Sequence, residues 1–266
     1  MLLFPPAKIN LGLKVLKKRS DGYHEIETCM LAIPMTDALE ILPSDDFEFH
    51  QTGLTVDGDQ ESNLCVKAFR LFQERHKIPN AYIHLRKQLP MGAGLGGGSA
   101  DASYVLRGLN ELFDCQLPDE ELRNMASQLG SDCPFFVSDE AQIGRGTGTD
   151  LSPFPIDLKG HYLKVINPGI HIGTKEAYSG IHFSESTSPL AEVLQLPITE
   201  WKEHLHNDFE THIFETHPEI AELKEQMYSE GAIYASMTGS GSTVFGIFEE
   251  RPEITTELYE QVMKIS

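Results

Sequence analysis

The alternation of hydrophobic and polar residues predicts strands in the first part of the chain. Between residues 9 and 15 every second residue is aliphatic, and the residues between them are Asn10, Gly12 and Lys14. This period of two is typical of a strand with one buried face, so we expect Lys8 and Asn10 together on the polar face. Further strands are predicted near residues 26–33, 38–42, 47–49 and 81–86.

Helices are predicted where the hydrophobic period lengthens. Six hydrophobic residues between positions 102 and 113 recur at spacings of three and four, and Ser99 is placed to cap the first turn of this helix. One helix is predicted to begin near Asn63, and another to cover about residues 119–129 and end at Gly130. In the second half, helical stretches are predicted near residues 190–196, 201–216 and 219–229, followed by two paired strands at residues 232–237 and 243–248.

The strongest chemical signal is a glycine-rich loop between a predicted strand and a predicted helix. Residues 90–102 read PMGAGLGGGSADA, with five glycines in seven consecutive positions. Glycine tolerates positive φ and lets backbone N–H groups approach an anion, while the N-terminus of the next helix adds unpaired donors and a positive dipole end. The loop therefore predicts a phosphate-binding site. A flexible linker is the alternative, but a linker would not normally join an apolar strand to an amphipathic helix.

Other nucleotide-binding motifs match this loop only in part. Gly92, Gly94 and Gly97 satisfy G-x-G-x-x-G, but a dinucleotide-binding fold needs a strand with an acidic residue about 20 positions on, and a second helix follows instead. The P-loop pattern requires Lys followed by Ser or Thr where this chain has Ser99 and Ala100. The protein-kinase sequences H-R-D and D-F-G do not occur. We therefore expect a phosphate site of a different type.

Composition and charge exclude several classes of protein. The chain has 266 residues, of which 40% are hydrophobic and 23% are charged, as in an ordinary globular protein with one large or two smaller domains. Its formal net charge of -19 argues against binding to nucleic acid or to anionic membranes, so an anionic substrate needs a local positive site. The four cysteines form no C-x-x-C pair, and no segment resembles a signal peptide or a membrane span, which together favour a cytoplasmic location.

The histidine-rich segment 203–217 carries no zinc motif. It holds four of the eleven histidines together with three glutamates, but no H-E-x-x-H sequence. The hydrophobic residues at positions 201, 205, 209 and 213 have the spacing of one helix face. We therefore expect a single helix here, with most of the histidines and glutamates on its solvated sides.

Three segments resemble the GHMP kinase superfamily, the small-molecule kinases of galactose, homoserine, mevalonate and phosphomevalonate type. They are PPAKINL at residues 5–11, the glycine loop, and TGSGST at residues 238–243, in that order. The segments RSDGYH, LGSDCPFF and GRG, which begin at residues 19, 129 and 144, resemble the branch whose substrate is methylerythritol linked to cytidine diphosphate. The resemblance covers nearly the whole chain.

The resemblance implies a two-domain α/β (α+β) fold. The N-terminal unit would be similar to the second domain of ribosomal protein S5 and the C-terminal unit would be ferredoxin-like, with the active site in the cleft between them. The glycine- and proline-rich segment 144–155 is the predicted divide, which gives domains 1–155 and 156–266. A homodimer is compatible with the sequence, which does not decide the oligomeric state.

The same resemblance implies an activity, cofactors and catalytic residues. ATP, accompanied by Mg²⁺, would phosphorylate the 2-hydroxyl of the methylerythritol unit, in the non-mevalonate isoprenoid pathway. Asp132 would take the proton from that hydroxyl, and Lys8 would keep Asp132 ionised and stabilise the developing alkoxide. Asn63 would lie beside adenine, and Ser99 near the β-phosphate or Mg²⁺; no acidic magnesium ligand is implied. The remaining predicted ATP-binding residues are Pro90, Met91, Gly92, Ala93, Gly94, Leu95, Gly96, Gly97, Gly98 and Ala100.

The substrate site is predicted around a cytosine ring. By resemblance Tyr23 stacks on the ring, His24 hydrogen-bonds it, and Tyr178 covers its other side. The remaining predicted substrate-binding residues are Asn10, Gly239 and Ser240.

Three alternatives are weighed against this interpretation. A GHMP kinase for homoserine or a mevalonate-type acid needs no cytosine site, so the Asp-Gly-Tyr-His segment and Tyr178 argue against it. A dinucleotide-dependent oxidoreductase would bind NAD(H), but the second strand of its fold is missing. A noncatalytic nucleotide-binding relative is disfavoured because both Lys8 and Asp132 are present.

Overall fold

The computed structural model describes residues 1–55, 58–181, 183 and 188–265, and the chain forms two compact units. Unit 1 consists of Met1–Ala7, Met35–Met91 and Gly96–Asp139. Unit 2 consists of Lys8–Pro34, Gly92–Leu95 and Glu140–Ser266. Each unit therefore takes segments from several parts of the chain, and the predicted domains 1–155 and 156–266 stay a prediction.

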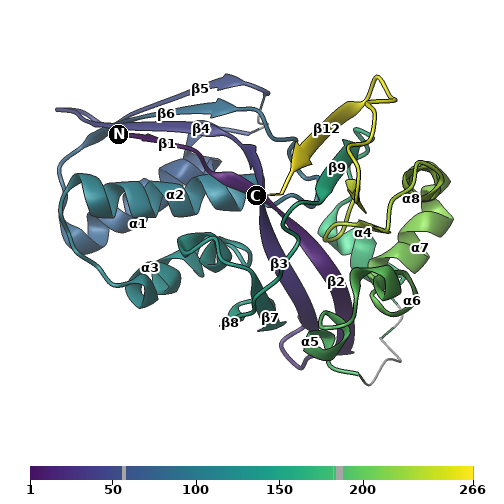
Figure 1. Cartoon of the computed structure of the whole chain (residues 1–266). Helices are drawn as coiled ribbons and strands as arrows, with labels where there is room; N and C mark the ends of the chain where they lie inside the picture. The colour runs from purple at the N-terminus through teal and green to yellow at the C-terminus, as the bar shows by residue number, and fades with distance from the viewer. Residues whose placement is uncertain (56–57, 182, 184–187, 266) are drawn as a thin grey trace. The chain divides into compact units, whose positions relative to one another are not determined.

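Unit 1 is a four-stranded sheet with helices packed on one face (Figure 1). The strand order is β1-β4-β6-β5, in which β4 pairs antiparallel with β6 and β5 pairs parallel with it. Its elements are β1 (Leu2–Leu3), β4 (Ala38–Pro43), β5 (Glu48–Gly53), β6 (Ala81–Lys87), the 3₁₀ helices η1 (Gln60–Ser62) and η2 (Cys133–Val137), and the helices α1 (Leu64–His76), α2 (Gly97–Leu112) and α3 (Asp119–Ala126).

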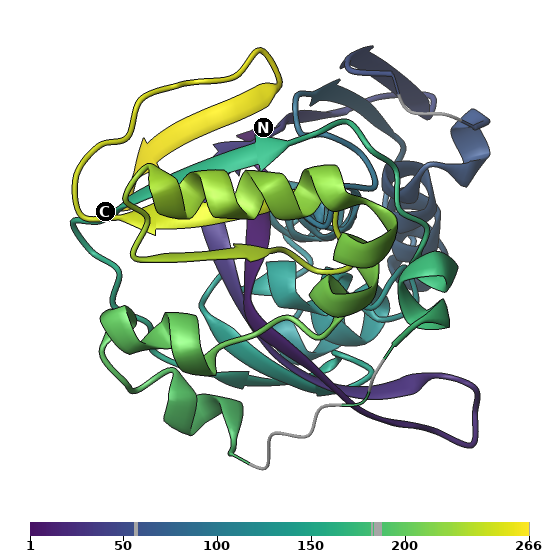
Figure 2. The same ribbon diagram turned by 90° about the vertical axis from the view of Figure 1, so that its right-hand side faces the viewer.

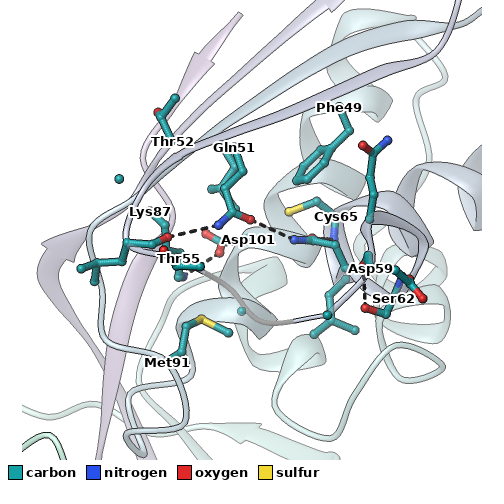
Figure 3. Close-up of a pocket in the computed structure, with 18 residues that line it drawn as sticks. Phe49, Gln51, Thr52, Thr55, Asp59, Ser62, Cys65, Lys87, Met91 and Asp101 are labelled. Carbon is teal, nitrogen blue, oxygen red and sulfur yellow. Dashed lines mark hydrogen bonds and ion pairs between the residues drawn. The ribbon is translucent and has the colours of Figure 1, made fainter.

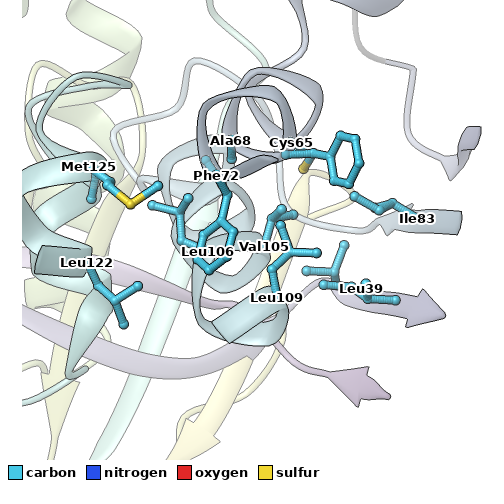
Figure 4. Close-up of a cluster of buried hydrophobic side chains, with 14 of the residues drawn as sticks. Leu39, Cys65, Ala68, Phe72, Ile83, Val105, Leu106, Leu109, Leu122 and Met125 are labelled. Carbon is cyan, nitrogen blue, oxygen red and sulfur yellow. The ribbon is translucent and has the colours of Figure 1, made fainter. Parts of the chain in front are cut away.

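The core of unit 1 lies between this sheet and its helices. Phe72 of α1, Leu106 and Leu109 of α2, and Leu39 and Ile83 of the sheet belong to one cluster, and all five side chains are fully buried (Figure 4). Burying a side chain of this size stabilises a fold by about 1.5–3 kcal/mol. The periodicity that predicted α2 therefore identified its buried face correctly.

The ends of α1 and α2 differ from each other. Helix α1 begins directly after Asn63, close to the predicted start. Asn63 is its N-cap, because its side chain accepts a hydrogen bond from the Cys65 backbone N–H at 2.9 Å. The prediction that Ser99 caps α2 is wrong: the N-cap of α2 is Gly96, three residues earlier, with φ of 69°. A glycine offers no side chain, so the first turn of α2 keeps its N–H groups available for another acceptor.

Unit 2 contains two further four-stranded sheets, ordered β2-β3-β7-β8 and β10-β11-β9-β12. The second is antiparallel throughout, and α8 packs along its strands β10 and β11 (Figure 2). The strands are β2 (Pro6–Lys18), β3 (His24–Thr36), β7 (Gln142–Gly146), β8 (Asp150–Pro153), β9 (Tyr162–Asn167), β10 (Tyr234–Met237), β11 (Val244–Phe248) and β12 (Tyr259–Lys264). The helices are α4 (Thr174–Ser179), α5 (Leu190–Val193), η3 (Ile198–Glu200), α6 (Trp201–His204), α7 (Phe209–Thr216) and α8 (Pro218–Ser229).

Strand β2 is not half-buried as predicted. Lys8 and Asn10 are each only 3% exposed, so the polar face of the strand is covered as fully as the apolar one. Polar side chains buried to this extent need hydrogen-bond partners, because an unpaired buried donor or acceptor is costly. Burial of a polar strand face is therefore the first sign of a functional site in unit 2.

The single helix predicted over residues 201–216 is also wrong. Helix α6 ends at His204 and α7 begins at Phe209, and the chain between them runs beside β2. There the Leu13 N–H donates to the His206 carbonyl and the Asp208 N–H donates to the Leu13 carbonyl, each at 2.9 Å. These long-range hydrogen bonds replace the helical ones. Glu210 is only 8% exposed, unlike most of the polar residues in this segment.

The segment predicted to divide the domains begins with a β-hairpin. Its strands β7 and β8 pair antiparallel within unit 2, from Gln142 opposite Pro153 to Arg145 opposite Asp150. Its glycines therefore serve a tight turn as well as any change of domain. Among the described residues, no helix combines the length and the apolar character that crossing a bilayer requires.

Candidate active site

Unit 1 holds a pocket of about 540 Å³ (Figure 3). It is formed by the end of β5 and the segment after it, by the start of α1, and by the glycine loop with the first turns of α2. Three of the residues predicted to bind ATP line this pocket, namely Asn63, Met91 and Gly98. A pocket of this size beside a glycine loop suits a nucleotide.

A glutamine that sequence analysis missed organises one wall of the pocket. The Gln51 side-chain amide donates to the Leu54 carbonyl at 3.1 Å and accepts from the Asn63 side chain at 3.3 Å. In Figure 3 Gln51 lies between Lys87 and Cys65. Gln51 therefore joins the segment after β5 to the N-cap of α1. The parallel pairing of β5 with β6 places it there, and no local pattern in the sequence indicates that pairing.

A buried charge cluster also borders this pocket. The Lys87 ammonium lies 2.5 Å from an Asp37 oxygen and 2.8 Å from an Asp101 oxygen, and all three side chains are at most 3% exposed. Burial by itself would lower the pKa of Lys87, but the two carboxylates outweigh it and hold that pKa above its ordinary value. Burial raises the pKa of Asp101 to about 7, although Lys87 opposes the shift. Sequence analysis missed this cluster.

Glycine is required where α2 passes this cluster. A Cβ added to Gly97 would lie 2.9 Å from the Lys87 ammonium nitrogen and 3.3 Å from the Leu89 Cβ. The absence of a side chain therefore lets the first turn of α2 lie directly against Lys87. The helix N-terminus that is predicted to bind phosphate thus packs directly against the buried Lys87 ammonium.

Asp132 lies at the start of η2, which packs against α2 within unit 1. The Ser103 hydroxyl of α2 donates to the Cys133 carbonyl at 2.7 Å. A Cβ on Gly130 would lie 3.3 Å from the Cys133 sulfur and 3.9 Å from the Ser99 hydroxyl oxygen. Gly130 therefore lets the turn before Asp132 approach the first turn of α2, and the predicted residues Ser99 and Asp132 belong to one local structure. The Asp132 side chain is half-buried.

In unit 2, Lys8 and Asn10 form a hydrogen-bonded pair on β2. The Lys8 ammonium donates to the Asn10 side-chain oxygen at 2.5 Å. The Asn10 amide nitrogen donates to the Thr28 hydroxyl at 2.9 Å, and that hydroxyl donates to the Gly12 carbonyl at 2.7 Å. The expectation that both side chains leave the strand on one side is confirmed. The Asn10 side chain orients Lys8, whereas its predicted contact with substrate stays a prediction.

The glycine loop residues of unit 2 are tied to β2 and to the turn between β10 and β11. The Lys8 N–H donates to the Leu95 carbonyl at 2.9 Å, and the Thr243 N–H donates to the Ala93 carbonyl at 3.3 Å. Gly94 has φ of 77°, and a Cβ there would lie 2.1 Å from the Thr238 carbonyl oxygen. The turn at residues 238–243 is thus more than a hairpin connection, because it touches the loop directly.

The other predicted residues of this turn lie in the same place. A Cβ on Gly239 would lie 3.4 Å from both the Asn10 side-chain oxygen and the Gly94 Cα, so this glycine is packed between β2 and the loop. Ser240 is half-buried. Unit 2 therefore brings together Lys8, Asn10, the front of the glycine loop and the predicted residues Gly239 and Ser240.

The aromatic residues predicted to hold cytosine are arranged differently from a simple clamp. The His24 and Tyr178 rings are stacked, with centroids 4.4 Å apart and planes within 14°, and Phe209 meets the Tyr178 ring edge-on at 4.8 Å. Tyr23 is 65% exposed. Burial, helped by Lys18, lowers the pKa of His24, which favours the neutral ring. His24 thus covers one face of Tyr178, and a clamp formed by Tyr23 and Tyr178 stays a prediction.

Comparison with known proteins identifies the family of this chain. Residues 63–140 match the model of the GHMP kinases N terminal domain, and residues 190–262 match that of the GHMP kinases C terminal. The 4-diphosphocytidyl-2-C-methyl-D-erythritol kinase of Cytophaga hutchinsonii is 46% identical over 254 residues, covering 95% of this chain and 94% of that protein. The enzyme of the same name from Parabacteroides distasonis is 47% identical over 250 residues, covering 94% and 92%. The chain belongs to the 4-diphosphocytidyl-2-C-methyl-D-erythritol kinase family.

Solved structures agree with this assignment. The crystal structure of a 4-(cytidine 5'-diphospho)-2C-methyl-D-erythritol kinase superposes with a TM-score of 0.81 at 32% identity, covering 93% of this chain and 90% of that one. A homoserine kinase from Cytophaga hutchinsonii superposes with a TM-score of 0.69 at 18% identity, and shares the fold alone. The predicted two-domain GHMP kinase fold is confirmed, and the chain is an ATP-dependent small-molecule kinase. The oxidoreductase alternative is excluded.

Proposed function

We propose that the chain transfers the γ-phosphoryl group of ATP to the 2-hydroxyl of 4-diphosphocytidyl-2-C-methyl-D-erythritol, in the non-mevalonate isoprenoid pathway. The products are ADP and the 2-phosphate. The observation that carries the choice of substrate is the stack of His24 on Tyr178 after the turn at residues 20–22, since kinases of homoserine or mevalonate need no site for cytosine. A cytoplasmic location, the absence of nucleic-acid and membrane partners, and a homodimer stay predictions.

We propose that the adenine base of ATP binds to unit 1. The phosphates of ATP are proposed to bind to the glycine loop. Adenine would occupy the pocket beside Asn63, whose side chain is oriented by Gln51 and by the first turn of α1. The triphosphate would accept hydrogen bonds from the loop and from the uncapped first turn of α2, where the helix dipole favours anions.

Mg²⁺ is proposed to accompany ATP and to neutralise charge on the phosphates. The first turn of α2 fits this role, because Ser99 is its third residue and its hydroxyl is an oxygen donor of the kind that Mg²⁺ prefers. We assign that hydroxyl to Mg²⁺ or to the β-phosphate.

Phosphoryl transfer requires positioning and charge neutralisation more than covalent help from the protein. In the proposed mechanism the Asp132 carboxylate accepts the proton of the 2-hydroxyl as that oxygen attacks the γ-phosphorus. The Lys8 ammonium is proposed to stabilise the negative charge on the attacking oxygen. The hydrogen bond from Lys8 to Asn10 supports this role, because it limits the freedom of a long side chain.

The substrate base is proposed to bind through the residues that follow the turn after β2. Arg19 and Asp21 shape this turn, because the Asp21 carboxylate accepts hydrogen bonds from both the Arg19 guanidinium and the Tyr23 N–H. The neutral His24 ring can exchange hydrogen bonds with cytosine, whereas Tyr23 and Tyr178 would stack on it. Gly239 and Ser240 are assigned to the rest of the substrate.

The test is a comparison of acceptors. The purified chain is incubated with ATP, Mg²⁺ and one candidate alcohol at a time, and release of ADP is followed. We expect turnover of the diphosphocytidyl substrate and none of homoserine or mevalonate. Turnover of either of these without turnover of the diphosphocytidyl substrate would overturn the proposal. The Asp132→Asn variant, purified in the same way, measures any contaminating kinase.

A further inference from the structure

The turn between β10 and β11 begins with a threonine that the assigned roles leave out. Thr238 is fully buried, and its hydroxyl oxygen accepts the Asn10 backbone N–H at 3.0 Å. The same hydroxyl faces two acceptors, the Asn10 side-chain oxygen and the Gly94 carbonyl, each at 3.2 Å. One hydroxyl carries one proton, so these two acceptors share it. Thr238 thus links β2 directly to the glycine loop.

The turn that carries Thr238 is also held by Asn207, which lies just before α7, and by Glu210 in the first turn of α7. The Asn207 side-chain amide donates to the Met237 and Gly239 carbonyls, both at 2.8 Å, and accepts the Phe209 N–H at 3.1 Å. Glu210 accepts the Met237 N–H at 2.7 Å. Both side chains are buried, so these hydrogen bonds are protected from water. The carbonyl groups on either side of Thr238 therefore have little freedom to move.

The same segment is fastened to β2, the strand of Lys8. Asn207 forms an isolated parallel bridge with Leu13, and the Asp208 carboxylate accepts the Val15 N–H at 2.7 Å. The strand and the turn are thus fixed to one common support. Thr238 closes this arrangement at the point where the strand carries Asn10 and the loop carries Gly94.

We infer that Thr238 is a positioning residue for phosphoryl transfer: it holds Asn10 and the Gly94 carbonyl together, and so sets the Lys8 ammonium relative to the glycine loop. The inference rests on the proposed role of Lys8. Lysine has four rotatable side-chain bonds, and its ammonium is held in part by the Asn10 oxygen that Thr238 also contacts. Without the hydroxyl, Asn10 loses one donor to its side chain and the acceptor of its N–H, and the Lys8 ammonium is held less firmly.

The experiment compares Thr238→Val, which keeps the shape and removes the hydroxyl, with Thr238→Ser, which keeps the hydroxyl. We expect Thr238→Val to lower kcat by roughly 10-fold with a much smaller change in KM for ATP, because the buried Asn10 and Gly94 groups lose their partner while the proposed adenine pocket beside Asn63 is untouched. Thr238→Ser should restore most of the lost kcat. Thr216→Val is the control for loss of a threonine hydroxyl, since Thr216 is exposed and its hydroxyl donates to the His212 and Ile213 carbonyls of its own helix α7, and it should leave kcat unchanged. Equal kcat in Thr238→Val and in the unmodified chain would overturn the inference.

A merely structural role is separated by repeating the substitution without the lysine. In a Lys8→Met background, Thr238→Val should lower kcat by no more than about 2-fold, because a residue that acts through Lys8 has nothing left to position. A full additional loss would overturn the inference and leave the role of Lys8 intact. A normal kcat in Lys8→Met alone would overturn the proposed role of Lys8 and the inference with it. If Thr238→Val fails to fold, Thr238→Cys, with its weak S–H donor, takes its place in both comparisons.

Discussion

The two glycine-rich segments of this kinase have similar composition, but their polar groups differ in whether they are bonded to the rest of the protein. In the loop, Gly92, Gly94 and Gly96 adopt positive φ and lead into a helix whose first turn has no side-chain cap. In the turn at residues 238–243 the polar groups bond to the protein itself: the Thr238 hydroxyl to β2 and the loop, and the Ser242 hydroxyl to the Ile170 carbonyl at 2.5 Å. Glycine content marks an unusual backbone shape in both segments. The unengaged first turn of α2 favours the loop as the proposed phosphate site, whereas the buried hydroxyl groups of Thr238 and Ser242 hold the turn in place.

The largest expected effect separates catalysis by Asp132 from the ATP binding proposed for the loop. Asp132→Asn should lower kcat by roughly 10²- to 10⁴-fold, the range for loss of a general base, and should leave ATP affinity unchanged because no loop donor is altered. Steady-state kinetics and calorimetric titration with a nonhydrolysable ATP analogue measure the two quantities. A folded variant with near-normal kcat would remove Asp132 from the mechanism.

The next effect is expected where the two segments touch. Gly94→Ala should lower activity by roughly 10²-fold and the melting temperature by about 5–10 °C, because the new Cβ meets the Thr238 carbonyl and φ of 77° is strained for alanine. Gly98→Ala is the control for the melting temperature, since its Cβ would lie 3.7 Å from the nearest side-chain atom. Equal behaviour of the two variants would contradict the direct contact between loop and turn.

The loop should be sensitive to side chains that reach the charge cluster behind it. Gly97→Val would press against Lys87 and disturb the first turn of α2, so ATP affinity should fall by roughly 10- to 100-fold, or about 1.4–2.8 kcal/mol. Titration of the folded variant with a nonhydrolysable ATP analogue measures this. An unchanged affinity would mean that the phosphates bind away from α2.

Substitution of the aromatic residues of unit 2 should change binding of the diphosphocytidyl substrate without changing binding of ATP. Tyr178→Ala and Tyr23→Ala should each raise KM for the diphosphocytidyl substrate by roughly 5- to 150-fold, since stacking on a base is worth ~1–3 kcal/mol, while KM for ATP barely changes. The melting temperature is measured in parallel. For Tyr178, a loss of stability without a selective rise in KM would show that its ring only packs against His24 and Phe209.

The smallest expected effect concerns the charge cluster behind the loop. Because the pKa of Asp101 is raised from 3.8 to about 7, the folded chain keeps a proton that the unfolded chain releases as pH rises from about 4 to about 7. Asp101 therefore makes folding less favourable over this window. Asp101→Asn should flatten the decline of melting temperature between about pH 5 and pH 7.5.

A second buried lysine cluster provides the control for this pH dependence. Glu260 contacts Lys164 at 2.6 Å, and although burial opposes the shift, its pKa is lowered by Lys164 and by the Thr255 and Thr256 N–H groups. Glu260 therefore adds stability above its ordinary pKa, which is lost as pH falls. Glu260→Gln should lower the melting temperature most near neutral pH. The same pH response in both variants would contradict the difference between the clusters.

Local sequence determined the elements whose stabilising contacts lie nearby. The cap of α1 at Asn63, the buried face of α2 and the pairing of β10 with β11 follow from spacing over a few residues, and the structure agrees with each. The glycine loop was also predictable, because a cluster of glycines before an amphipathic helix has few structural uses. The GHMP kinase family could be identified from such segments, since their order along the chain is itself sequence information.

Tertiary structure decided whatever depends on partners far along the chain. Burial of Lys8 and Asn10, the hydrogen bond from Asn10 to Thr238 across 228 positions, and the interruption between α6 and α7 all arise from long-range contacts. The charge cluster of Lys87, Asp37 and Asp101 and the stacking of His24 on Tyr178 have the same origin. A strand pattern states which side chains share a face, but only packing of the remaining chain determines what covers that face. The residues that pack over a polar side chain determine its pKa and its orientation. The helices and strands were therefore predictable from the sequence, whereas the hydrogen bonds and ion pairs of the site were not.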